Sequence, residues 1–143
     1  MKKKASGKLR GRLHARGYEQ VEGKHYFEHD TAAAVTNPIT IRIVITMMAM
    51  PTAWIAEVLD VDGAFLQGQF YNGEKLYIGI PNEFEEWYDD DKVLLMNIPL
   101  YGTNQVANCF YKMLVKRMTN KDYKRSNADP YLFYIYTLVE DWC

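Results

Sequence analysis

Apolar and polar positions along the chain follow two different repeats, and each repeat predicts a different kind of element. Over residues 104–120 the apolar side chains recur every three or four positions, which is the spacing of one helix face. These side chains are Val106, Phe110, Met113, Leu114 and Met118. Over residues 75–80 and 92–98 apolar and polar positions alternate, as in a strand. We therefore expect one helix and two strands in these segments.

A second helix is expected over residues 39–50. Asn37 followed by Pro38 is a typical helix start, and the apolar run ends at Pro51. The many β-branched residues in this run favour a strand instead. The pattern and the start signal together favour the helix.

The remaining segments complete a mixed architecture. Strands are expected over residues 54–60, which end on Asp60, and over the aromatic-rich residues 131–139. Residues 9–25 are interrupted by glycines and predict short strands joined by turns, whereas the acidic residues 83–91 predict a solvated loop. We expect strands and helices to mix within one α+β unit.

The composition indicates a globular intracellular chain. The 143 residues are 48% hydrophobic and 14% aromatic, which is enough for a packed core. The longest apolar stretch, residues 43–51, is too short for a membrane span, and no apolar segment of a secretory signal follows the basic start. The two cysteines have no metal or redox spacing, so we expect reduced thiols.

The formal net charge of −1 hides three charged regions. Residues 1–24 hold eight Lys or Arg side chains against Glu19 and Glu22, and residues 112–125 hold six against Asp122. Residues 74–92 are acidic. The two basic regions suit a phosphate-bearing partner, although either one is equally well explained as a solvated surface.

Two short motifs suggest chemistry. Asp60, at the end of an apolar segment and before an Asp-Gly pair, is suited to hold a divalent cation, but the same residues also make an ordinary turn. His25, Glu28 and His29 match the H-x-x-E-H pattern of some zinc proteases, which we regard as a chance match. There is no P-loop, dinucleotide fingerprint or recognisable Ser/His/Asp set.

Six segments, read in order along the chain, are similar to strings of one protein family. The segments are residues 10–20, 30–42, 60–68, 77–84, 100–110 and 125–133. The family strings are K-A-R-L-V-A-R-G-Y-x-Q, D-T-Y-A-P-V with T-I-R, motif A D-V-K-x-A-F-L-x-G, Y-M-x-x-P-x-G-F, motif B L-Y-G-L-K-Q-A-P-R-x-W, and R-S-x-A-D-P-x-L-Y. Together they resemble the reverse transcriptase domain of Ty1/copia-type retrotransposons. The resemblance covers roughly residues 8–134 and leaves residues 1–7 as a basic tail.

The resemblance implies a partial right-hand polymerase, with fingers and palm built on a mixed, mainly antiparallel sheet and packed helices. Asp60 would be one of three carboxylates that hold two Mg²⁺ or Mn²⁺ ions. Phe65 matches the aromatic residue that excludes a ribose 2′-hydroxyl, and Gln105 matches the motif B glutamine near the incoming dNTP. The partners implied are an RNA or DNA template with its primer, and dNTP.

Basic residues complete the expected site. Arg10, Arg12 and Arg16 are candidates for contacts with triphosphate or template phosphate, and the candidates for nucleic-acid binding are Lys116, Arg117 and Lys121. Motif B departs from the family at Asn104, Val106 and Asn108, and motif A at Asp62. The motif B changes weaken the expected contacts with nucleotide and template, whereas Asp62 either disturbs metal placement or points to solvent.

The chain ends at Cys143 without the Y-V-D-D-like motif C that supplies the family's other two carboxylates. We therefore expect a domain over residues 8–143 that stops before motif C and has little or no activity alone. Residues 138–141 are only faintly similar to that motif. An unpaired sheet edge would favour self-association. The alternative function is a catalytically inactive nucleic-acid-binding remnant.

Overall fold

The computed structural model describes residues 2–3, 7, 9–10, 13–50, 57–71 and 73–136. It divides into two compact units. The first unit comprises Met1–Ala32 and Gly63–Phe110, and the second comprises Ala33–Asp62 and Tyr111–Cys143.

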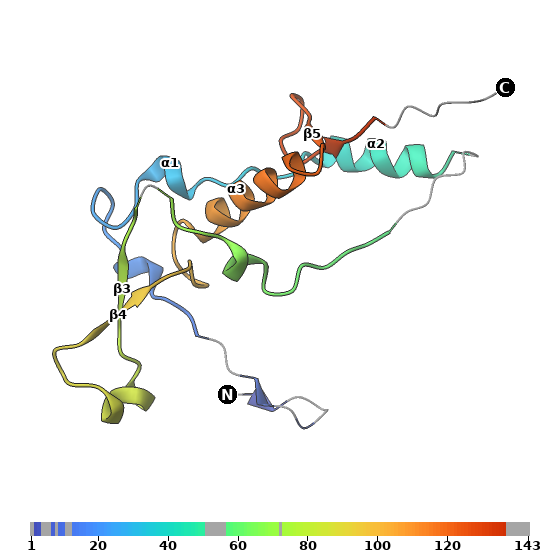
Figure 1. Ribbon diagram of the computed structural model, residues 1–143. Coiled ribbons are helices and arrows are strands. Elements are labelled where there is room, and N and C mark those ends of the chain that lie inside the picture. The colour runs from blue at the N-terminus through green and yellow to red at the C-terminus, as the bar shows by residue number, and fades with distance from the viewer. Residues whose placement is uncertain are drawn as a thin grey trace. The chain divides into compact units, whose positions relative to one another are not determined.

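The first unit contains a two-stranded antiparallel hairpin (Figure 1). Its strands are β3 (Leu76–Gly79) and β4 (Val93–Met96), so the two strands predicted from alternation are confirmed. Leu76 is buried, whereas its neighbour Tyr77 is exposed, as alternation requires. The connecting segment begins with a 3-10 helix, η3 (Asn82–Trp87), so the acidic stretch is exposed as expected but is not entirely loop.

The rest of the first unit consists of short elements. Strand β1 (Lys2–Lys3) pairs antiparallel with β2 (Leu9–Arg10). Three single turns of helix follow along the chain: η1 (Gly17–Glu19), α1 (Glu28–Thr31) and η2 (Ala64–Gln67). Of the short strands expected over residues 9–25, the described residues show only β2, and residues 13–25 form a turn-rich segment without a named strand.

The strand expected over residues 54–60 is not found in the part that the structure describes. Residues 54–56 lie outside the described residues, and residues 57–60 have no regular structure. A strand is stable only when a neighbour takes up its backbone hydrogen bonds, and none of the described sheets includes these residues. Asp62 and Gly63 form a turn, as one interpretation of this motif predicted.

The second unit contains the two predicted helices, although the unit boundary falls inside the later one. Helix α2 (Pro38–Met48) is confirmed, and the side-chain Oδ1 of Asn37 accepts a hydrogen bond from the Ile39 backbone N–H at 2.9 Å. This contact satisfies one of the free N–H groups at the helix start. None of the α2 side chains is buried. Helix α3 (Val106–Thr119) is also confirmed.

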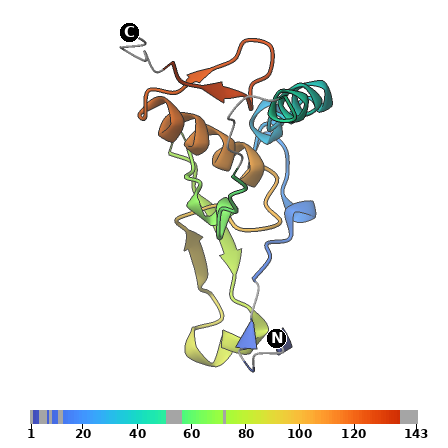
Figure 2. The same ribbon diagram turned by 90° about the vertical axis from the view of Figure 1, so that its right-hand side faces the viewer.

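A short antiparallel hairpin follows α3. Strand β5 (Lys124–Arg125) pairs with β6 (Phe133–Tyr134), with Lys124 opposite Tyr134. The predicted strand over residues 131–139 is thus confirmed for two residues, and its last three lie outside the described residues. Figure 2 shows this hairpin beside the last turns of α3.

The described residues are of the α+β class, with three two-stranded antiparallel sheets. The finer expectation, a right-hand polymerase fold, stays a prediction, as does self-association. None of the described helices has the length and apolar character needed to cross a membrane.

Candidate functional site

In the first unit, two segments far apart in the sequence lie against each other. We name residues 13–25 the arm and residues 100–105 the motif B loop. The Ala15 backbone N–H donates a hydrogen bond to the Tyr101 carbonyl oxygen at 2.7 Å. A Cβ atom at Gly17 would overlap the Gly102 carbonyl oxygen, and one at Gly102 would overlap the Ala15 carbonyl oxygen. Only glycines allow the two backbones to approach this closely.

Side-chain amides fasten the same two segments together. Gln20 Nε2 donates to Gln105 Oε1 at 3.1 Å, and Gln20 Oε1 accepts from the Asn104 backbone N–H at 2.7 Å. Gln105 Nε2 in turn donates to the His25 carbonyl oxygen at 3.2 Å. Both ends of both glutamine amides are therefore hydrogen-bonded between the arm and the motif B loop.

The resemblance implies that Gln105 lies near the incoming nucleotide, and the structure shows the contacts that it makes without one. Its residue surface is only 1% exposed, and a buried amide is stable only with its hydrogen bonds made. In this conformation both polar atoms of the amide serve the arm. A contact with nucleotide stays a prediction that requires exchanging one of these bonds.

Phe65 is held by aromatic neighbours in the first unit. Its ring packs edge-on against Tyr101, with centroids 5.5 Å apart and planes at 61°, and against Phe110 at 6.1 Å and 76°. Edge-to-face pairs of this kind are favourable beyond their buried area. Phe65 therefore has a fixed ring position beside the motif B loop.

A groove of about 540 Å³ lies between the arm and strand β3. Arg16 lines it and pairs with Glu19, Nη1 to Oε1, at 3.1 Å. This hydrogen bond to Glu19 raises the pKa of the exposed Arg16 guanidinium, which is cationic at every relevant pH. Arg12 lies outside the described residues, and Arg10 is described only as a residue of strand β2.

Asp60, the predicted metal ligand, belongs to the second unit and is exposed. Its carboxylate is an oxygen donor of the type that Mg²⁺ prefers. Across the described ranges, no three His, Cys, Asp or Glu side chains lie close enough together to hold a metal ion. The described residues therefore contribute a single predicted ligand and do not make a complete site. Residues 138–141 lie outside them.

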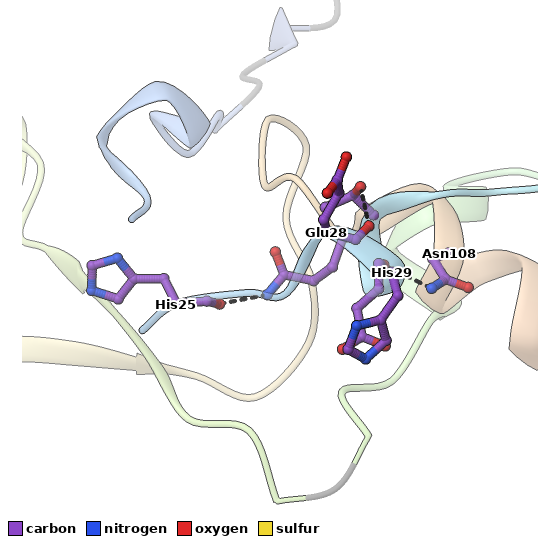
Figure 3. Close-up of polar contacts among 7 residues, drawn as sticks. His25, Glu28, His29 and Asn108 are labelled. Atoms are coloured by element: carbon purple, nitrogen blue, oxygen red, sulfur yellow. Dashed lines mark hydrogen bonds and ion pairs between the residues drawn. The ribbon is translucent and has the colours of Figure 1, made fainter. Parts of the chain in front are cut away.

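The possible zinc ligands do not converge. Helix α1 is a single turn that begins at Glu28, so His25 precedes it and does not share a helix face with His29. Figure 3 shows the imidazole of His25 pointing away from Glu28 and His29. His25 Nδ1 accepts a hydrogen bond from the Val21 backbone N–H at 2.8 Å, and the His29 ring stacks on Phe27. Local contacts thus account for both imidazoles.

The basic residues predicted to bind nucleic acid are exposed in the second unit. Lys116 and Arg117 lie in the last turn of α3, and Lys121 lies in the turn that follows. Cations at this position are favoured by the negative end of the helix dipole. Lys124 and Arg125 of β5, which end the basic region of residues 112–125, are also exposed.

Sequence reasoning missed the role of Asp129, which is only 1% exposed in the second unit. Its Oδ2 accepts from the Asn37 backbone N–H and its Oδ1 from the Tyr131 backbone N–H, both at 2.9 Å. A hydrogen bond from the Thr40 side chain is the largest cause that lowers the pKa of the Asp129 carboxyl. Asp129 therefore ties the start of α2 to the β5–β6 hairpin. Its only signal in the sequence was its place in the A-D-P string.

Comparison with known proteins identifies a family that matches this chain. The family described as "Reverse transcriptase (RNA-dependent DNA polymerase)" matches residues 1–139. Two Arabidopsis thaliana proteins, the retrovirus-related Pol polyproteins from transposons RE2 and RE1, are each 31% identical over 126 residues. Each match covers 88% of this chain and 8% of the relative, so the chain corresponds to a small part of those polyproteins.

No solved structure matches the chain. The family match spans nearly the whole chain, and both relatives are transposon Pol polyproteins. The six strings lie within the matched residues. Parts of three of them, namely the arm, the motif B loop and Phe65, lie together in the first unit. The chain therefore belongs to the reverse transcriptase (RNA-dependent DNA polymerase) family of Ty1/copia-type retrotransposons.

Proposed function

We propose that the chain forms the fingers and the first half of the palm of an RNA-directed DNA polymerase, which in the complete parent adds dNTPs to a primer. One observation carries the proposal: parts of three strings shared with the family meet in the first unit. The arm is hydrogen-bonded to the motif B loop, and Phe65 of motif A packs on Tyr101 of that loop. Segments that must act together on one nucleotide are thereby held together.

Phe65 supplies nucleotide selection in this proposal. Tyr101 and Phe110 fix its ring from two sides, so the ring cannot easily move aside for a larger sugar. A ribose 2′-hydroxyl would meet the ring, whereas a deoxyribose would not. The expected result is a preference for dNTP over NTP.

Arg16 supplies a cation for the triphosphate or the template backbone. Its present partner, Glu19, is exposed with it, and an exposed ion pair is weak because water screens both charges. A phosphate group, which accepts two charge-assisted hydrogen bonds from a guanidinium, can therefore replace Glu19. Arg10 and Arg12 are proposed for the same role on their sequence positions alone.

Asp60 is proposed to contribute one carboxylate to Mg²⁺ or Mn²⁺ in the parent polymerase. When bound, the two-metal centre activates the primer 3′-hydroxyl and neutralises charge on the leaving pyrophosphate. What this chain itself provides is an exposed carboxylate that can approach a metal without first breaking a buried contact. The basic surface of the second unit, with Lys116, Arg117 and Lys121, would hold the template and primer.

A second candidate function is nucleic-acid binding without catalysis. It is favoured by the concentration of exposed cations at the end of α3 and on β5, which suits a phosphate backbone whatever the state of the metal site. The two functions share their binding partner and differ in whether Asp60 matters.

Primer extension on an RNA template separates the two. The assay is run on the chain and on a fusion that appends the segment following the match in the Arabidopsis relative, with Asp60→Asn and, as a matched control two residues away, Asp62→Asn. Polymerase function predicts Mg²⁺-dependent extension by the fusion that is lost in Asp60→Asn and kept in Asp62→Asn. Binding without extension in every form, with no effect of Asp60→Asn, would favour the second candidate.

A further inference from the structure

One face of the β5–β6 hairpin carries two tyrosines and a lysine side by side. Lys124 lies opposite Tyr134 in the antiparallel pair. Tyr136 lies two residues after the end of β6. The two rings form an edge-on pair with centroids 5.2 Å apart, and Lys124 Nζ lies 5.6 Å from the centre of the Tyr136 ring. We name Lys124, Tyr134 and Tyr136 the tyrosine face.

The opposite face of the hairpin is anchored within the second unit. Arg125 Nη1 donates a hydrogen bond to the Tyr111 hydroxyl of α3 at 3.2 Å, and that hydroxyl donates to the Pro130 carbonyl oxygen at 3.1 Å. The Tyr111 and Tyr131 rings pack with centroids 4.8 Å apart. The hairpin is therefore held by one face, and the tyrosine face is turned to solvent.

Charge distinguishes the tyrosine face from the other exposed aromatic side chains of the chain. Tyr136 is 76% exposed and Tyr134 is 37% exposed, so both rings are open to contact. Residues 112–125, which lead into this face, hold six Lys or Arg side chains against the single carboxylate of Asp122. Lys116, Lys121 and Lys124 are all exposed. The segment that leads into this face is thus strongly cationic, and Lys124 lies on the face itself.

Exposed aromatic rings amid cations are the combination that binds single-stranded nucleic acid. Bases of any sequence stack on the rings, while the cations follow the phosphates. An intact duplex presents no free base face, and an acidic peptide would use the lysines without using the rings.

We propose that the tyrosine face binds a single-stranded segment of RNA or DNA, with a base stacked on the open side of the Tyr136 ring and a phosphate near Lys124. The inference rests on the proposed function, because it specifies how the second unit would hold an unpaired template. It adds a site for base stacking to a surface whose other proposed contacts with nucleic acid are made by charged side chains alone. Lys124 over one side of the Tyr136 ring also fixes that ring in place by a cation–π contact.

The test measures binding of fluorescein-labelled 12-nucleotide RNA and DNA strands without secondary structure to the 143-residue chain, by fluorescence anisotropy. The variants are Tyr136→Ala, Tyr136→Phe and Lys124→Gln. Trp87→Ala is the matched control, because Trp87 is 73% exposed and also forms an edge-on pair, with Phe84 at 5.4 Å. Trp87 lies in the acidic stretch, so it presents an exposed ring without the cations.

We expect Tyr136→Ala to raise the Kd about fivefold or more, the usual loss when one stacking side chain is removed. Tyr136→Phe and Trp87→Ala should stay within about twofold of the wild type, because each leaves the proposed stack intact. The salt dependence separates the two contributions: Lys124→Gln should reduce the slope of log K against log salt by about 0.7, and Tyr136→Ala should leave the slope unchanged.

Three results would overturn the inference. If the wild type binds but Tyr136→Ala binds equally well, the tyrosine face is not a stacking site, while the proposed function stands. If Tyr136→Ala instead turns an oligomer into a monomer in gel filtration without changing Kd, a second copy covers this face. If the wild type binds neither strand nor a primer–template duplex, the proposed function fails as well.

Discussion

The crossing of the arm over the motif B loop makes a prediction about Gly17. Replacing Gly17 with Ala adds a Cβ that overlaps the Gly102 carbonyl oxygen and lies 3.2 Å from Asn104 Oδ1. The atom in the way belongs to the backbone, so relief requires the two segments to separate. Separation would weaken the Ala15 to Tyr101 hydrogen bond.

The magnitude follows from three contributions. Overpacking a tight contact costs about 1–3 kcal/mol, and weakening one hydrogen bond adds about 0.5–1.5 kcal/mol. The reduced freedom of the unfolded chain offsets roughly 0.5–1 kcal/mol. We therefore expect Gly17→Ala to lower the free energy of unfolding of the first unit by about 2 kcal/mol, and by no more than roughly 4 kcal/mol.

Gly79→Ala is the matched control. A Cβ at Gly79 meets no atom within 4 Å, and the residue lies at the end of strand β3. Since glycine is unfavourable in a strand relative to alanine, this change should raise the free energy of unfolding by about 0.5–1 kcal/mol. The two identical substitutions are thus expected to have opposite signs.

Urea unfolding followed by circular dichroism compares the two variants, and amide hydrogen exchange at Ala15 reports on the crossing itself. Gly17→Ala should shift the urea midpoint down and speed exchange at Ala15, while Gly79→Ala leaves that amide protected. Equal free energies of unfolding for the two variants, within about 0.5 kcal/mol, would refute the close approach of the arm and the motif B loop.

Two further predictions concern buried polar contacts. A double-mutant cycle of Gln20→Ala and Gln105→Ala, measured by urea unfolding, should give a coupling energy of about 0.5–3 kcal/mol, and additive effects would mean that the amides do not meet. Hydrogen bonds lower the pKa of the Asp129 carboxyl in the folded protein below its usual value of 3.8. The ionised carboxylate therefore stabilises the fold fully above pH 3.8, and this stabilisation is lost as the pH falls through the lowered pKa of the folded state. The melting temperature of Asp129→Asn should therefore vary less than that of the wild type between pH 4 and about pH 2, and parallel curves would contradict this role.

Much of the local structure follows from the sequence. The three- and four-residue spacing predicted α3 to within two residues at its start, and alternation predicted β3 and β4. The Asn37–Pro38 signal predicted the start of α2, including its cap. These elements depend on neighbours along the chain, which is the information that a periodic pattern contains.

Contacts between distant segments could not be predicted in the same way. Gln20 and Gln105 are 85 positions apart, and Asn37 and Asp129 are 92 apart. A single glutamine or aspartate carries no periodic signal, so nothing in the pattern said which polar residue would be buried and paired. The strand expected before Asp60 shows a related limit. Alternation predicts which side chains share a face, but it does not predict the neighbouring strand that makes a strand stable.

The candidate site was predictable in part because of the family strings. Motifs A and B led to Phe65 and Gln105 before any geometry was known, but not to the aromatic neighbours that fix Phe65 or the amide contacts that occupy Gln105. The basic end of α3 was predicted from charge. The tyrosine face beside it depends on the register of β5 with β6, which only the structure reveals.

The central claim is that this chain takes part in reverse transcription by binding template and primer, and equilibrium binding of a labelled RNA–DNA primer–template to the 143-residue chain tests it most directly. The account predicts binding at 50 mM salt that weakens at least about tenfold at 200 mM, because the proposed contacts are cations on phosphates. Absence of binding at 50 mM salt, or binding that does not respond to salt, would contradict it.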